Sequence, residues 1–145
     1  AHPRGGNAAP KLLGGTRVPA DAERLAAVSR WVSDPQNPSF ARAQANRVWL
    51  HLLGRGLVDP NDDFRATNPP SNPALLDHLT STFAAGGYRL KPLVRHVMTS
   101  RVYQLSATPN ETNADDQTHF SRGRVQPLEA EQLLDAVSEV LDRPV

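Results

Sequence analysis

The sequence predicts an all-α fold of about five main helices in a compact bundle, with a long proline-rich loop between the second and third helices. Apolar residues recur every three or four positions in five segments, which is the helical period. No segment alternates apolar and polar residues convincingly, as a strand would. Because the turns at 34–37 and 86–89 are short, we expect helices that follow one another in sequence to pack together.

Length and composition favour one folded domain. The chain has 145 residues, of which 39% are hydrophobic and 21% charged, so it can bury a real core. Residues 1–19 contain glycine and proline but no apolar periodicity, which predicts an extended arm or linker. We therefore expect a single helical domain over 20–145. The chain opens at Ala1 without a methionine, which suggests a C-terminal fragment of a larger protein.

The first two helices have recognisable ends. We expect the first helix over Ala20–Ser33, with Asp21 as its N-cap. The second begins after Asn37, where Pro38 occupies the first turn, and it ends at Gly54. The residues expected to face the core are Leu25, Val28 and Val32 in the first helix, and Ala41, Ala45, Val48, Trp49 and Leu52 in the second.

The remaining three helices follow the same logic. The third repeats the Asn-Pro start at Asn72 and ends at Gly86. The fourth begins near Leu90 and fades near Tyr103, and the last opens at Pro127. Their expected inward faces are Leu75, Leu76, Leu79 and Phe83; Leu93, Val94, Val97 and Met98; and Ala130, Leu133, Leu134, Val137, Val140 and Leu141.

Residues 57–71 form an unusually long connection, of a length that is often functional or disordered. We expect Phe64 to anchor this 57–71 loop to the core. An Asp-x-Asn-x-Asp run starting at Asp59 has the spacing of a calcium loop, but Phe64 stands where that loop needs glycine and Pro70 where it needs glutamate. An EF-hand is excluded, and solvated loop acids explain the spacing better than an irregular calcium site does.

Polar side chains gather on the second helix and in the loop after it. One interpretation is structural: Arg42, Asn46 and Arg47 hold the 57–71 loop by bonding its acids or carbonyls, since a buried loop must satisfy its backbone. The other is an anion or carbohydrate site with Trp49 as an apolar wall. The candidate cluster comprises Arg42, Asn46, Arg47, Trp49, His51, Arg55, Asp62 and Asp63.

The sequence lacks the motifs of several common metal, cofactor and catalytic sites. The chain has no cysteine, which excludes thiolate zinc sites, iron–sulfur clusters and covalent haem on this segment. Nucleophile and phosphate-loop motifs are also missing, and its five histidines form no local pair, although a site assembled from distant parts stays open. We therefore predict no metal and no cofactor. Sixteen Lys and Arg against 15 Asp and Glu leave almost no net charge, so the chain lacks the positive electrostatic potential that attracts nucleic acid. We also expect no membrane contact by this segment, because it has no apolar run of the length that a membrane span needs.

An ordered series of motifs runs along the chain: Arg30-Trp31-Val32, Asp34-Pro35, Asn37-Pro38, Phe40-Ala41-Arg42, Asn46-Arg47, Trp49, Gly54-Arg55-Gly56-Leu57-Val58, Asp63-Phe64, Pro70-Ser71, Leu75-Leu76-Asp77, Leu90-Lys91, Thr99-Ser100, Tyr103-Gln104 and Leu128-Glu129-Ala130-Glu131. This series resembles the planctomycete-specific C-terminal domain of unknown function 1553. The resemblance covers roughly residues 25–140. One departure is Arg65, which follows Asp63-Phe64 where the family commonly has glycine.

The resemblance implies an extracytoplasmic, exported multidomain parent. Such parents often carry a cytochrome c-like domain, so a c-type haem is expected on another domain, and a carbohydrate context is implied as well. The family supplies no catalytic residues. We expect a non-catalytic interaction or assembly module whose partners are other domains of the same parent chain. The alternative is a ligand-binding or hydrolytic domain in polysaccharide processing that uses Arg47, His51, Asp62 or Asp63. The sequence leaves open whether the protein is an enzyme.

Overall fold

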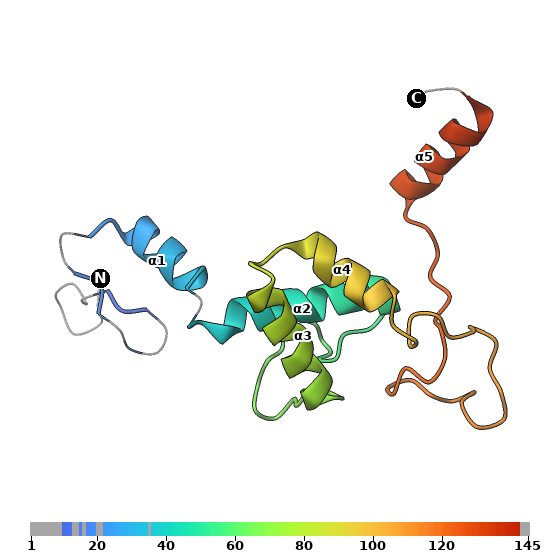
Figure 1. Cartoon of the computed structure of the whole chain (residues 1–145), viewed down its shortest axis with the longest axis horizontal. Helices are drawn as coiled ribbons and strands as arrows, with labels where there is room; N and C mark the ends of the chain where they lie inside the picture. Colours follow the sequence, from blue (N-terminus) through green and yellow to red (C-terminus); the bar gives the residue numbers. More distant parts are fainter. Residues whose placement is uncertain (1–9, 13–14, 16, 20–21, 35, 143–145) are drawn as a thin grey trace, which may run out of the picture.

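The computed structural model describes residues 10–12, 15, 17–19, 22–34 and 36–142 (Figure 1). Within these residues the chain forms five α-helices and no strand, apart from an isolated bridge between Lys11 and Arg17. The predicted all-α fold of five helices is thereby confirmed. None of the described helices combines the length and apolar character needed to cross a membrane.

The helix bounds agree with expectation in the middle of the chain and differ at its ends. Ala20 and Asp21 lie outside the described residues, and the first helix starts after Glu23 rather than Asp21. The fourth helix ends at Met98, well before Tyr103, and at its end both the backbone N–H and the hydroxyl of Thr99 donate to the Arg95 carbonyl at 2.9 Å. The helices are α1 Arg24–Val32, α2 Pro38–Leu53, α3 Pro73–Ala85, α4 Leu90–Met98 and α5 Ala130–Leu141.

Asparagine caps start the two central helices as predicted. Asn37 Oδ1 accepts a hydrogen bond from the Ser39 backbone N–H at 3.1 Å at the start of α2. Asn72 does the same for Leu75 at 3.0 Å at the start of α3. At the other end of α2, Gly54 has φ +78°, a left-handed conformation that glycine adopts without strain. Local chemistry thus fixes where α2 and α3 begin and where α2 stops.

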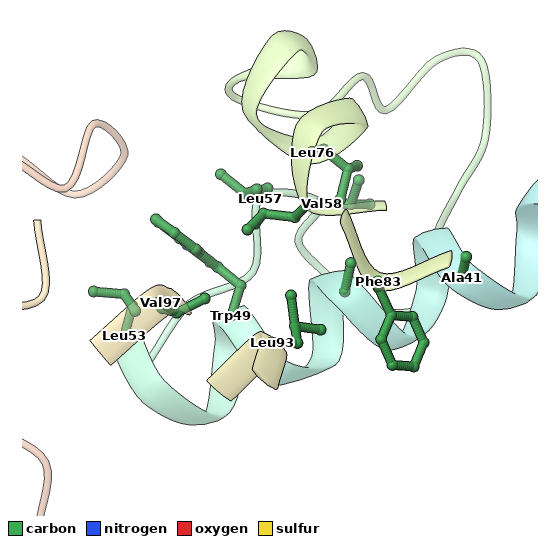
Figure 2. Close-up of a cluster of buried hydrophobic side chains, with 11 residues drawn as sticks. Ala41, Trp49, Leu53, Leu57, Val58, Leu76, Phe83, Leu93 and Val97 are labelled. Atoms are coloured by element: carbon green, nitrogen blue, oxygen red, sulfur yellow. The ribbon is translucent and has the colours of Figure 1, made fainter. Parts of the chain in front are cut away.

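The hydrophobic core lies between α2, α3 and α4. Helix α2 packs against both α3 and α4, and these two pack against each other (Figure 1). The residues just after α2 complete the core, because they fold back under α3. The buried cluster comprises Ala41, Ala45, Trp49, Leu53, Leu57, Val58, Leu76, Leu79, Phe83, Leu93 and Val97 (Figure 2).

Helices α1 and α5 contribute no buried residue to this core. In α1, the side chains of Leu25 and Val28 are 75% and 46% exposed, so the expectation that they face the core is wrong. In α5 the same expectation is wrong for Leu133, Leu134, Val137, Val140 and Leu141, which are 45–83% exposed and are called the α5 stripe below. Helical periodicity identifies an apolar face but does not say what covers it.

The predicted arm at 1–19 and its boundary at residue 20 fall largely outside the described residues. Among those that are described, Val18 is buried and its backbone N–H donates to the Pro10 carbonyl at 3.1 Å. The helical part of the domain prediction, 20–145, starts with α1 at Arg24.

We expect Leu76→Ala to lower the free energy of unfolding by about 2–5 kcal/mol, because Leu76 is fully buried and its removal leaves a cavity. Leu25→Ala on α1 is the control and should change it by less than about 0.5 kcal/mol. Urea unfolding followed by circular dichroism measures both. Equal losses in the two variants would mean that the α2–α3–α4 core described here is not the stable part of the chain.

Candidate functional site

Asn46 is the polar centre of the structure. Its side chain is fully buried, and Asn46 Nδ2 donates to the Val58 carbonyl at 2.9 Å. Its Oδ1 accepts from the Val58 N–H, also at 2.9 Å. The same Nδ2 reaches the backbone carbonyl and Oδ1 of Asn61, both at 3.1 Å. One amide on α2 therefore satisfies both backbone groups of Val58 and fixes the start of the 57–71 loop.

Gly56 makes this close approach sterically feasible. A Cβ at that position would lie 2.2 Å from the Val58 carbonyl oxygen and 3.0 Å from Asn46 Nδ2. No real side chain is accommodated at the first distance without moving the backbone. The two glycines after α2 thus have different tasks: Gly54 supplies the left-handed turn, and Gly56 supplies space.

The 57–71 loop closes on itself. The Ser71 backbone N–H donates to the Leu57 carbonyl at 2.7 Å, and Asn68 Nδ2 donates to the Asp63 carbonyl at 2.9 Å. Leu57 and Val58 are buried and anchor the loop to the core. Phe64 is 39% exposed, so the expectation that it is the anchor is wrong. The loop is anchored instead by Leu57 and Val58, the two loop residues nearest to α2, where the hydrogen bonds of Asn46 already fix the backbone.

Arg55 shares the task of holding the loop. Its Nε lies 3.3 Å from Oδ2 of Asp59, four residues further along the chain. Its guanidinium also donates to the Gln117 carbonyl and, at 3.4 Å, to Thr118 Oγ1. Arg55 thereby links two connections that are about 60 residues apart in sequence.

Arg42 and Arg47 do not hold the loop as expected. Arg42 pairs with Asp77 of α3 at 3.0 Å instead. Arg47 and His51 are exposed and make no hydrogen bond or ion pair within the described part of the chain. Residues 42 and 46 share one face of α2, whereas 47 and 51 project from another, so only the first face meets the loop and α3. The interpretation that the whole arginine–asparagine set is used internally is therefore wrong for Arg47.

Trp49 is a core residue. It is 2% exposed, and its ring meets that of Phe120 edge to face, with centroids 5.2 Å apart. Its indole Nε1 has no hydrogen-bond partner among the described residues. In the loop, Asp63 pairs with Arg65 at 2.6 Å and Asp62 is exposed. Within the described residues, no hydrogen bond or ion pair joins these acids to Arg47 or His51.

Two hollows flank this region. One of about 660 Å³ lies between α2 and the 57–71 loop, with Arg42, Phe64, Arg65 and Asn68 among its lining residues. The other, of about 270 Å³, is mainly apolar. Sequence reasoning missed the second, because it joins residues from four distant segments. Its lining includes Trp49, Leu57, Leu75, His96, Val97, His119 and Phe120.

The structure contains no group of three or more metal-ligating side chains within the residues that it describes. The strongest local electrostatic feature is instead Asp116, in the connection between α4 and α5. Its carboxylate accepts hydrogen bonds from the Ser121 hydroxyl and from the backbone N–H groups of His119, Ser121 and Thr118. These bonds, that of the Ser121 hydroxyl above all, hold the pKa of Asp116 well below its usual value of 3.8. Asp116 thus organises the turn that presents Phe120 to Trp49.

We expect Asn46→Ala to destabilise the fold by roughly 1–3 kcal/mol for each Val58 backbone group that it leaves buried and unpaired. Urea unfolding gives the value. Asn46→Asp, which keeps an acceptor but no donor, should also be destabilised. Arg47→Ala on the exposed face is the control, with a change below about 0.5 kcal/mol. An Asn46→Ala variant as stable as Arg47→Ala would refute the assigned role of Asn46.

Asp116 predicts a specific acid response. Because its pKa is lowered in the folded state, its stabilisation is complete above the unfolded pKa near 3.8 and is lost as the pH falls towards the folded pKa. We expect the amide signals of Thr118, His119 and Ser121 to keep their native positions in NMR spectra down to pH values where ordinary aspartates are protonated. Asp116→Asn should displace these signals already at neutral pH. Asp115→Asn, a change at the exposed neighbour, should leave them unchanged, and an identical response of the two variants would contradict the assignment.

The family described as PSD1, protein of unknown function (DUF1553), matches residues 23–144. No curated protein and no solved structure matches the chain. The match spans the three packed helices, Asn46, Gly56 and the α5 stripe. The chain therefore belongs to the PSD1 (DUF1553) family, whose function is unknown.

Proposed function

We propose that this domain is a non-catalytic interaction module that docks onto another domain through the α5 stripe. The observation that carries the proposal is the exposure of five large apolar side chains on one helix that buries nothing against its own core. Contiguous exposed apolar surface of this kind marks interaction sites in soluble proteins. Helix α5 is drawn well away from α2–α4 in Figure 1.

The charge pattern of α5 supports helix-in-groove binding. Its first-turn acid Glu131 lies on the side away from the stripe, as do Asp135 and Glu139, so the helix is amphipathic with an acidic outer face. Apolar side chains spaced three and four residues apart on a helix are the residues that insert into a hydrophobic groove on a partner. The helix is also pre-formed, with Glu129 and Gln132 making a reciprocal capping box at its start.

The polar cluster on α2 supports a structural role in the same way. Its one fully buried polar residue, Asn46, is used in holding the loop, and Arg55 bonds two connections. Those groups are thus committed within the chain. The residues that would carry hydrolysis, Arg47 and His51, stand apart from the loop acids and from any polar partner in the described part of the chain.

The partner that we propose is a neighbouring domain of the same parent chain. The setting is an exported, cytochrome c-like multidomain protein outside the cytoplasm, with any c-type haem on another domain. This part of the proposal rests on the resemblance described above, and it accounts for a helix whose apolar face is left uncovered in the domain by itself.

The test is to place a charge in the α5 stripe. Leu134→Asp should leave the free energy of unfolding of this chain almost unchanged, because α5 buries nothing here. In calorimetric titrations with the adjoining domain of the parent, it should weaken binding at least tenfold, since an unpaired charge would be buried at the interface.

Glu139→Gln is the control, because it changes the charge by one unit on the acidic face of α5, opposite the stripe. It should bind as the unchanged chain does. If Leu134→Asp destabilised the chain itself as much as a core substitution, the stripe would be packed internally and the proposal would fail. Unaltered binding by Leu134→Asp would likewise contradict it.

A second candidate function is supported by the hollow between α2 and the 57–71 loop. The half-exposed Phe64 ring offers a sugar an apolar face there. Arg42 and Arg65 also line the hollow, and because they already pair with Asp77 and Asp63, an acidic sugar would have to compete with those carboxylates. Glucuronate should then raise the melting temperature of the chain, and Arg65→Ala should abolish the shift. Absence of any shift with millimolar glucuronate would exclude this candidate.

A further inference from the structure

Two histidines meet on the surface between α3 and α4. His78 and His96 are 18 residues apart in sequence, and their Nε2 atoms lie 3.2 Å apart. The ring centroids are 5.3 Å apart and the planes are inclined at 47°. Both side chains are exposed. The sequence gives no local sign of this pair, because its members belong to different helices.

Two imidazole nitrogens this close need an electrophile between them. If both Nε2 atoms carried only lone pairs, they would repel each other. A proton on one Nε2 converts the contact into a hydrogen bond. A divalent metal ion replaces that proton when both rings are protonated on Nδ1 instead, which is the usual tautomer of a histidine that binds metal through Nε2.

The separation of the two nitrogens suits a metal ion. Zinc binds imidazole nitrogen at about 2.0–2.1 Å in tetrahedral geometry, which puts two such ligands roughly 3.3–3.4 Å apart. The observed 3.2 Å lies close to this value. The rings need only a small rotation for both lone pairs to converge on one point.

The helices that carry the histidines hold them in place. Within three residues of His78 on the same helix, Leu76 and Leu79 are buried in the core, and Leu93 and Val97 are buried within three residues of His96. The two helix backbones are thus fixed by packing before any ion arrives. Little conformational entropy remains to be lost on binding apart from that of the two exposed rings.

We propose that His78 and His96 form a two-histidine binding site for a late first-row divalent ion such as Zn²⁺. Imidazole ligands with no carboxylate among them select this class rather than Mg²⁺ or Ca²⁺, which prefer oxygen. Water completes the coordination shell. His96 also lines the apolar hollow of about 270 Å³, so the proposed site borders that hollow. This inference is independent of the proposed docking through α5.

The test is isothermal titration of the chain with ZnCl₂, in a His2→Ala background so that His2 does not contribute. One equivalent should bind. Either His78→Ala or His96→Ala should weaken it by about tenfold or more, because one of two ligands is lost. His51→Ala, which removes an exposed and unpaired histidine from α2, is the matched control and should bind as tightly as the background. MgCl₂ should give no binding.

Circular dichroism establishes that the variants are folded, as expected for exposed positions. Failure of millimolar zinc to bind the folded background would overturn the site and leave a hydrogen-bonded pair. Binding that persists unchanged in both His78→Ala and His96→Ala would overturn it too, because the ion would then be held elsewhere. Neither result would affect the α5 experiment.

Discussion

The structure depends on one buried amide. The side chain of Asn46, on helix α2, hydrogen-bonds both the N–H and the carbonyl of Val58. In a sheet, a neighbouring strand would provide these two hydrogen bonds. A buried peptide group without a partner is costly, and the 57–71 loop has no regular structure in which to find one. Because Asn46 supplies it, Leu57 and Val58 can enter the core and carry α3 into place over α2.

This constraint divides the chain into a packed centre and uncovered ends. Once the loop is fixed, α2, α3 and α4 bury one another, and Arg55 extends the order to the connection that carries Phe120. Neither α1 nor α5 is reached by these interactions, although both have apolar faces. The same sequence property, an amphipathic helix, therefore has two outcomes: it builds a core in the centre and leaves an uncovered apolar face at the end, which is the face that we propose docks onto another domain.

Sequence reasoning predicted the local features well and the distant ones poorly. The asparagine caps and the terminal glycine of α2 could be read because their chemistry acts within a few residues. Placing the α5 stripe in the core failed, since periodicity carries no information about partners. The expectation that Arg47 holds the loop together with Asn46 failed, because successive residues on a helix point about 100° apart and the two side chains therefore lie on different faces. The His78–His96 pair was out of reach, because it depends on how α3 crosses α4.

The claim that Asn46 holds the loop is tested most directly by native-state hydrogen exchange at Val58. If its amide hydrogen is bound to Asn46 in the core, it exchanges only when the whole domain unfolds, with the same free energy as the amides in the middle of α2. Exchange at the rate of an exposed loop amide, while the α2 amides stay protected, would show that the loop opens by itself and that the fold does not depend on this contact.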